Sequence, residues 1–239
     1  MDYFSSLAVV QHTSAEYLGL MEVHFEGRKI RFSYFRPFTE RGTVPRLNAV
    51  GDGLILLGGG PWGSAGPRNV PTLIKEVELT HACLNEGLPV IGIGLGAQIL
   101  SLAAGGKTFA APLSFTVGDA SRVDDDALDG YLPTRYPNIV YMRDRFEPPP
   151  DARVLAVDAA GAPALFQLGV KAFGFAGHPG FKAAMAEDLI MEFEEGVEDP
   201  GPTLNEAREA KREIEDALVP IMTGLIQQTG LMEPRDGVA

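Results

Sequence analysis

The sequence predicts an α/β protein with a mostly parallel sheet and helices on both of its faces. Two observations lead to this fold class. Residues 53–57 and 90–93 are continuous apolar runs, typical of strands that are covered on both faces. Helical patterns alternate with such runs up to about residue 105, which indicates βαβ units and hence parallel pairing. The length of 239 residues is sufficient for one large domain with a substantial core.

The strands and helices follow from local patterns. In the first half of the chain we expect strands at 7–11, 30–35, 53–57 and 90–93, and helices at 16–25, 72–86 and from 97 onward. The strand at 30–35 alternates apolar and polar residues, which favours a place near an edge of the sheet. The pattern weakens between 107 and 151, where only a short strand at 139–142 is expected.

The second half predicts three more short strands and the C-terminal helices. The strands at 153–157, 164–168 and 172–175 are expected to form a small antiparallel extension, followed by a helix at 181–195. Thr203 and Glu206 have the spacing of a capping box for a long C-terminal helix, which Pro220 should kink. We therefore expect a main domain at 1–200 and a helical extension at 201–239, packed on the domain or on a partner, with a homodimer as one alternative.

The segment from Pro89 to Leu100 carries the most informative motif. A buried strand runs into a tight glycine turn and then into a helix, the layout that presents a nucleophile in many α/β hydrolytic enzymes. The tip of this turn is Gly94, which has no side chain. The glycine-rich loop at 58–66 also follows a predicted parallel strand, so we expect both segments to face one crevice.

Composition excludes several classes of partner. The net charge of −12 argues against nucleic acid and anionic membrane surfaces. No apolar stretch is long enough to span a bilayer, and residues 1–6 lack the basic start of a signal peptide, so the expected location is the cytoplasm. The single cysteine, Cys83, is interpreted as a packing residue and permits no intrachain disulfide. No cofactor and no metal are expected, because Asp124–Asp126 is most simply a solvated acidic turn.

Four motifs, in order along the chain, resemble the class I glutamine amidotransferase family in its GMP-synthase-like branch. They are Gln11-His12 with Leu18-Gly19-Leu20, the loop DGLILLGGGP at 52–61, the elbow GIGLGAQ at 92–98, and the closing segment FGFAGHPG at 173–180. The resemblance covers about residues 7–193 and implies a flavodoxin-like sheet. It also implies hydrolysis of the glutamine side-chain amide by a cysteine, a histidine and a glutamate.

The resemblance assigns roles to individual residues. The N–H groups of Gly60 and Leu95 would stabilise the oxyanion, with Gly59 beside them in the loop. Gln98 would help to hold the substrate. His178 would be the base that accepts and returns the proton.

The departures from the family pattern concern the triad itself. Gly94 stands at the nucleophile position and Gly180 at the glutamate position. Arg143 and Arg145 lie in a segment that differs from the family, and together with Gln98 they are candidate ligand-binding residues. Amide hydrolysis through a cysteine thioester is therefore not expected, and whether the protein is an enzyme of another kind stays open.

Three functions fit these residues. The first is a pseudoenzyme that binds a small molecule or a synthase-type partner enzyme as a non-catalytic or regulatory subunit. The alternative is an enzyme of changed chemistry, a hydrolase or lyase on a small amide or carboxylate, using the old pocket around His178. In the third, Ser64 or a partner chain supplies the nucleophile. Dinucleotide binding by Gly92–Ala97 is disfavoured because the third glycine has the wrong spacing.

Overall fold

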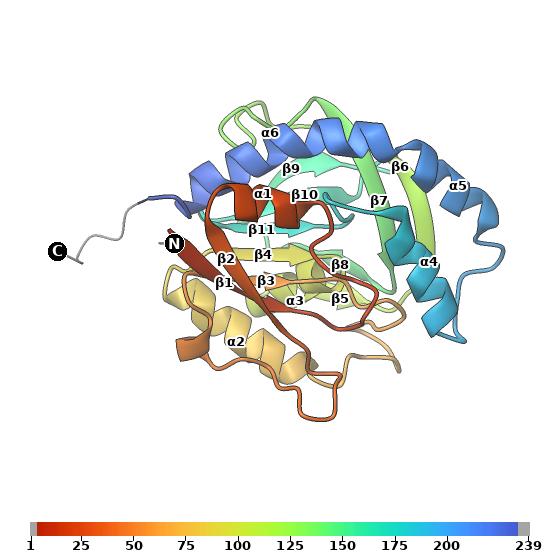
Figure 1. Ribbon diagram of the computed structural model, residues 1–239, viewed down its shortest axis with the longest axis horizontal. Helices are drawn as coiled ribbons and strands as arrows, with labels where there is room; N and C mark the ends of the chain where they lie inside the picture. Colours follow the sequence, from red (N-terminus) through yellow and green to blue (C-terminus); the bar gives the residue numbers. More distant parts are fainter. Residues whose placement is uncertain (1–3, 234–239) are drawn as a thin grey trace.

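The computed structural model describes residues 4–233. Two predictions fall partly outside that range: residues 1–3 belong to the segment tested for a signal peptide, and residues 234–239 belong to the predicted helical extension. Within residues 4–233, nine strands form one mixed sheet in the order β2-β1-β3-β4-β11-β10-β9-β6-β7, and β5 pairs with β8 in a separate small sheet (Figure 1). The strands are β1 (Ser5–Val10), β2 (Ile30–Phe35), β3 (Gly53–Leu56), β4 (Val90–Ile93), β5 (Lys107–Phe109), β6 (Ser114–Arg122), β7 (Arg135–Met142), β8 (Arg145–Glu147), β9 (Arg153–Val157), β10 (Pro163–Leu168) and β11 (Ala172–Phe175).

Helices cover both faces of the sheet. They are α1 (Met21–Gly27), α2 (Leu73–Asn85), α3 (Leu95–Ala103), α4 (Ala183–Glu192), α5 (Gly201–Glu209) and α6 (Lys211–Thr229). In β1, Leu7 and Val9 join the core cluster that contains residues of α1 and α6, whereas Ala8 and Val10 join the cluster that contains residues of α2 and α3. This alternation follows from the two-residue period of a strand. The predicted layered α/β fold is confirmed.

The sheet changes from parallel to antiparallel at β11. Strands β2, β1, β3, β4 and β11 pair in parallel, and β10, β9, β6 and β7 continue the sheet in antiparallel fashion. The predicted edge position of 30–35 is confirmed, because β2 is the first strand in the order. The predicted antiparallel extension of the sheet is also present, and β11 joins it to the parallel half by pairing with β4.

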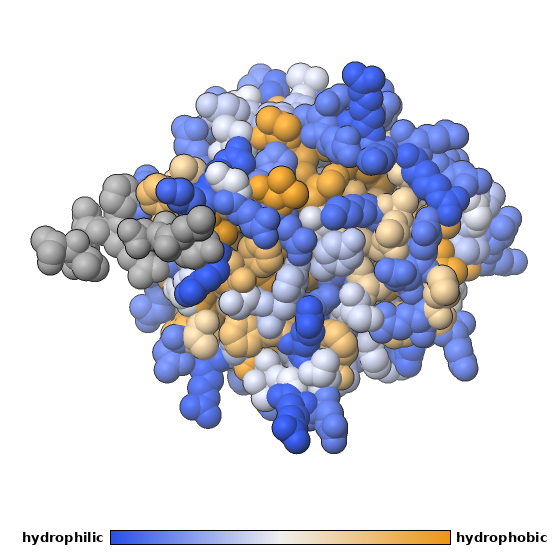
Figure 2. All heavy atoms as spheres, in the orientation of Figure 1, coloured by the Kyte–Doolittle hydropathy of each residue, from blue (hydrophilic) through white to orange (hydrophobic). Residues whose placement is uncertain are grey.

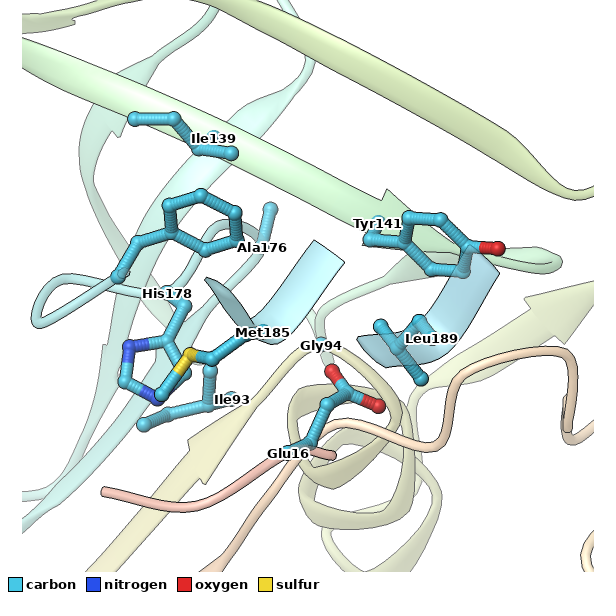
Figure 3. A pocket seen from close by; sticks show the side chains of 10 residues that line it. Glu16, Ile93, Gly94, Ile139, Tyr141, Ala176, His178, Met185 and Leu189 are labelled. Carbon is cyan, nitrogen blue, oxygen red and sulfur yellow. The ribbon is translucent and has the colours of Figure 1, made fainter. Parts of the chain in front are cut away.

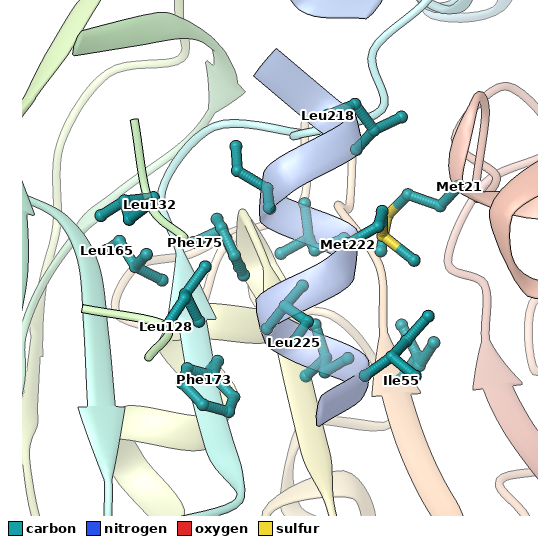
Figure 4. Packing of buried hydrophobic residues seen from close by; sticks show 14 of the residues in the cluster. Met21, Ile55, Leu128, Leu132, Leu165, Phe173, Phe175, Leu218, Met222 and Leu225 are labelled. Carbon is teal, nitrogen blue, oxygen red and sulfur yellow. The ribbon is translucent and has the colours of Figure 1, made fainter. Parts of the chain in front are cut away.

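Helix α6 completes one face of the core. Leu218, Met222 and Leu225 of α6 belong to the same core cluster as Phe173 and Phe175 of β11, and Figure 4 shows Met222 beside Met21 of α1. On the face in Figure 2, hydrophobic side chains gather over the region of α1 and α6, while hydrophilic side chains cover much of the remainder. No helix in residues 4–233 combines the length and apolarity that a membrane crossing requires.

Three local predictions were wrong. The first helix begins at Met21 instead of residue 16, and residues 11–20, named here the β1–α1 loop, run across the carboxyl end of the sheet. Strand β6 was missed because its residues are largely exposed on one side and include Gly118 and Asp119, which are poor strand formers. The C-terminal helix is divided at Ala210, and Thr203 lies inside α5, so it does not form the predicted cap.

Candidate functional site

The elbow lies between β4 and α3, with Gly94 at its tip. Gly94 has φ 57° and ψ −114°, and its N–H donates to the carbonyl of Phe175 at 2.9 Å. A positive φ favours glycine. Among the described residues, a β-carbon placed on Gly94 would meet only the Cα of Gly58, at an ordinary contact distance of 3.4 Å. The position therefore has space for a side chain, although the backbone conformation is that of glycine.

A buried ion pair positions the glycine loop opposite the elbow. His12 Nε2 lies 2.6 Å from Glu76 Oε2, and His12 Nδ1 lies 3.0 Å from the carbonyl oxygen of Gly58. Thr72 donates its hydroxyl to the second oxygen of Glu76. Both partners of the imidazole are acceptors, so both ring nitrogens donate and His12 is an imidazolium.

The electrostatics of the pair agree with this protonation. Burial lowers the pKa of His12, but the charge of Glu76 and its hydrogen bond outweigh burial, so the pKa is raised overall. Burial likewise raises the pKa of Glu76, and the positive charge of His12 reverses that effect, so its pKa lies below its usual range. A charged pair thus anchors Gly58 and fixes the course of the loop that contains Gly60.

Glu16 of the β1–α1 loop occupies the position beside the elbow. Its carboxylate accepts a hydrogen bond from the N–H of Gly60, the group that the family resemblance assigns to the oxyanion. The backbone N–H of Glu16 in turn lies 3.2 Å from Thr13 Oγ1, which holds the loop in this course. Figure 3 shows the carboxylate of Glu16 directed toward Gly94. An internal carboxylate therefore fills the place that the resemblance assigns to the oxyanion.

The Glu16 carboxyl is poised near neutral pH. Burial raises its pKa to about 7, and the Gly60 N–H and the positive charge of His12 oppose that rise only in part. Glu192 adds a smaller upward contribution through its negative charge. Protonation of Glu16 thus takes place in the pH range where a protein normally functions, so this group can exchange a proton there.

His178 is neutral and has one fixed tautomer. Its Nε2–H donates to the carbonyl of Tyr17 at 2.8 Å, and its Nδ1 accepts from the N–H of Gly180 at 3.1 Å. Burial lowers its pKa to about 4. The Tyr17 carbonyl thus fixes the Nε2–H tautomer, the opposite of the one that a triad carboxylate holds, and the Gly180 N–H takes up the Nδ1 lone pair. The imidazole has no free nitrogen with which to accept a proton from a nucleophile.

The backbone at Gly180 is enclosed. A β-carbon there would lie 2.8 Å from Met21 Cγ, 2.9 Å from Met21 N and 3.1 Å from the carbonyl oxygen of Leu18. At Gly177, a β-carbon would lie 2.3 Å from Asn138 Oδ1. Real β-carbons essentially never lie within 3.0 Å of a non-bonded heavy atom from elsewhere in the chain, so the surroundings of either glycine must shift to admit a side chain. A glutamate at position 180 therefore requires Met21 at the start of α1, and the end of the β1–α1 loop before it, to move.

The remaining cavity is very small. It is lined by Glu16, Gly94, Tyr141 and His178 together with apolar side chains, and its volume is about 10 Å³. This is roughly the room that one water molecule needs. In Figure 3 the side chain of Ile93 lies between the His178 ring and the Glu16 carboxylate. In this conformation the cavity cannot accommodate a glutamine side chain.

The other predicted ligand-binding residues are held in internal contacts. Gln98 accepts from the Ser64 hydroxyl and donates to the carbonyl of Arg143 at 2.6 Å. Arg143 donates to the carbonyl of Pro61 at 2.7 Å and pairs with Glu195. The cavity therefore brings Gly94 and His178 together; Gln98, Arg143, Arg145 and Gly59 are not among its described lining residues.

Two predicted site residues, Arg145 and Leu95, lie in secondary structure outside the lining of the cavity. Arg145 is exposed on β8 and pairs with Phe109 of β5. Leu95 begins α3 and is buried, and a β-carbon on Gly59 would lie 2.4 Å from Leu95 Cδ2. Gly59 thus permits the close approach of the glycine loop to the elbow helix.

Sequence reasoning missed Glu16, the residue that changes the site most. The signal was its place shortly after β1, because β1 and β3 are neighbours and their following loops meet at the same edge of the sheet. The helix expected at 16–25 concealed it. Tyr141 was also missed as a site residue; it belongs to β7 and its hydroxyl has no hydrogen-bond partner among the described residues.

The elbow after β4, the facing glycine loop and the histidine after β11 together define a protein with the architecture of an α/β hydrolytic enzyme. The family model described as glutamine amidotransferase class-I matches residues 35–194. This chain belongs to the class I glutamine amidotransferase family, as the resemblance predicts.

Relatives and solved structures agree with this membership. The chain is 30% identical over 166 residues to GMP synthase (glutamine-hydrolyzing) of Aeropyrum pernix, a match that spans 65% of this chain and 30% of that protein. It is 40% identical over 77 residues to the carbamoyl phosphate synthase small chain of Vibrio vulnificus, covering 30% of this chain and 20% of that one. The chain therefore spans only a minor part of these relatives.

The fold extends over nearly the whole chain. A glutamine amidotransferase from Thermotoga maritima superposes with a TM-score of 0.78 at 22% identity, covering 95% of this chain and 99% of that one. A glutamine amidotransferase from Methylobacillus flagellatus gives a TM-score of 0.77 at 20% identity, over 93% and 94% of the two chains. At these identities the likeness concerns the fold.

Proposed function

We propose that this protein is a non-catalytic member of the amidotransferase family, a pseudoenzyme that serves as a binding or regulatory subunit and does not hydrolyse glutamine. The observation that carries the proposal is the Glu16 carboxylate on the N–H of Gly60, beside Gly94. A negatively charged or neutral carboxyl in that place competes with the oxyanion that the family reaction needs.

Two further features support the proposal. Both ring nitrogens of His178 are engaged by backbone groups, so the residue at the base position has no lone pair available. The backbone around Gly180 leaves no room for an acidic side chain. Restoring a cysteine alone therefore does not rebuild the triad.

The direct test is ammonia release from glutamine, measured with a coupled glutamate dehydrogenase assay on the wild type and on Gly94→Cys. We expect no turnover from either protein. Labelling of the new thiol with iodoacetamide provides the control that position 94 carries a thiol, since Cys83 is buried and supplies a low background. Glutamine turnover by the wild type that is lost in His178→Ala overturns the proposal.

The expected partner is a synthase-type enzyme. One relative is by its name the small chain of a carbamoyl phosphate synthase, and another is a GMP synthase of which this chain matches 30%. A protein of this family without glutaminase chemistry retains the fold with which it can associate with such an enzyme. The test is co-expression with the synthase encoded nearest to it, followed by size-exclusion chromatography; separate elution of the two proteins contradicts a stable complex.

A second candidate function, an enzyme of changed chemistry, has its own supporting observation. The cavity combines a Glu16 carboxyl whose pKa is raised by burial to about 7 with the hydroxyl of Tyr141, which has no hydrogen-bond partner within residues 4–233. A carboxyl with this pKa is suited to general acid–base catalysis. Ammonia release from a panel of small amides that is abolished by Glu16→Gln favours this candidate, whereas activity unaffected by that change counts against it.

A further inference from the structure

A second and larger pocket lies where the C-terminal helices meet the body of the domain. Its volume is about 360 Å³, which is within the range of small-molecule sites. It lies among α4, α5 and the start of α6, the helices at the right and upper right of Figure 1. Helices α5 and α6 follow residue 194, where the match to the family model ends. The pocket thus uses residues outside the segment that the family model describes.

The floor of this pocket is apolar. Phe181, Ala207 and Ile214 line it and are almost fully buried in the domain, and Leu20 is half-buried beside them. Phe181 also lines the small cavity at Gly94. The apolar floor therefore backs onto the former catalytic centre from the outside.

The rim of the pocket is cationic in a protein of net charge −12. Three of its lining residues, Lys182, Arg208 and Lys211, carry positive charge, and one, Glu215, carries negative charge. Arg208 is paired with Glu187 at 2.8 Å. The two lysines are less engaged.

The available charge comes from those lysines. Lys182 Nζ lies 5.4 Å from the centroid of the Tyr17 ring and has no ion-pair partner among the described residues. Lys211 Nζ lies 3.8 Å from Glu215 Oε1, and its side chain is 76% exposed, so this pair is weak. Both ammonium groups can therefore reorient to contact an anion at the mouth of the pocket.

We propose that this pocket binds a small amphipathic anion, a molecule with an aliphatic body and one carboxylate or phosphate head. The apolar floor buries the body, because burial of apolar surface is the main favourable contribution in such sites. Lys182, just before α4, and Lys211, at the start of α6, face the head group. The ligand would lie where the C-terminal helices meet the wall of the small cavity at Gly94. This proposal does not depend on the absence of glutaminase activity.

The test is isothermal titration calorimetry of the full chain with decanoate and with decyl phosphate, below the concentrations at which they form micelles. We expect one molecule of at least one of the two to bind, and the preferred head group identifies carboxylate or phosphate. The double variant Lys182→Glu, Lys211→Glu should weaken binding by roughly tenfold or more, since it reverses two charges at the mouth. Ala183→Phe should abolish binding by filling the pocket.

Two matched controls separate the pocket from the general surface. Lys75→Glu reverses an exposed charge on α2, and Ala184→Phe adds the same ring at the neighbouring exposed position, outside the pocket lining. Both should bind like the wild type. Failure of both probes to bind overturns the proposal. So does binding that the pocket variants leave unchanged. Equal binding of decyltrimethylammonium, a cation of the same chain length, also overturns it.

Discussion

Replacing Glu16 by glutamine should change how the stability of the protein depends on pH. Glutamine keeps the size of the side chain and an oxygen that can accept the Gly60 N–H, but it does not titrate. Burial raises the pKa of Glu16 from 4.5 to about 7 in the folded protein. Each pKa unit corresponds to about 1.4 kcal/mol, so the shift represents about 3 kcal/mol.

The sign follows from proton binding. Between pH 4.5 and about 7 the folded state holds a proton on Glu16 that the unfolded state has released. The free energy of unfolding therefore falls as pH rises through this window and stays lower above it. The Glu16→Gln protein lacks this loss. The difference in free energy of unfolding between the variant and the wild type should therefore shift by about 3 kcal/mol in favour of the variant from pH 4 to pH 8. His12 and His178 are present in both proteins, and their titrations largely cancel in the difference.

The assay is urea unfolding of both proteins at several pH values, with stability extrapolated linearly to water. Glu78→Gln, an exposed site on α2, controls for the loss of one formal charge. If the curves of Glu16→Gln and the wild type run parallel from pH 4 to pH 8, the Glu16 carboxyl is not buried on the Gly60 N–H and the account of the filled oxyanion position is refuted.

Three further predictions concern individual residues. Gly180→Ala should lower the free energy of unfolding by about 1–3 kcal/mol, because its β-carbon meets Met21 and the Leu18 carbonyl. Gly118→Ala should have little effect, because no described atom lies within 4 Å of its β-carbon position. Equal urea midpoints of the two variants contradict this prediction. Burial raises the pKa of the Cys83 thiol to about 11, so Ellman's reagent at pH 8 should react only after unfolding, and rapid labelling of the native protein would be inconsistent with that. Nitrogen-15 NMR should show His178 as the neutral Nε2–H tautomer with its pKa lowered by burial to about 4; a titration midpoint above pH 6 argues against the buried ring.

The parallel half of the sheet was predictable because its strands are buried on both faces. The segments Val90–Ile93 and Gly53–Leu56 are apolar at every position, and few structures other than a strand buried on both faces fit this pattern. Strand β6 has no such run, since its exposed face admits polar residues and its pairing with β7 is long-range. The sequence therefore identified the elbow and the glycine loop correctly but left the antiparallel half incomplete.

The site was less predictable because the position of the β1–α1 loop depends on distant backbone groups. Leu20 N–H donates to the carbonyl of Gly180 at 2.9 Å, a contact across 160 residues of chain. Local propensity favoured a helix from residue 16, and tertiary hydrogen bonds overrode it. The motif comparison could locate Gly94, His178 and Gly180, but it contained nothing about a side chain from another loop.

The two glycines at the positions assigned to the triad are not equivalent. Gly94 has room for a β-carbon, whereas Gly180 is enclosed by Leu18 and Met21. The same segment that encloses Gly180 also places Glu16 on the Gly60 N–H and the carbonyl of Tyr17 on His178 Nε2. One course of the chain thus fills the position that the resemblance assigns to the oxyanion, engages His178 and encloses the position that it assigns to the acid. Building the triad that the resemblance implies would therefore require the β1–α1 loop and the start of α1 to move together, whereas a β-carbon at position 94 meets no such obstacle.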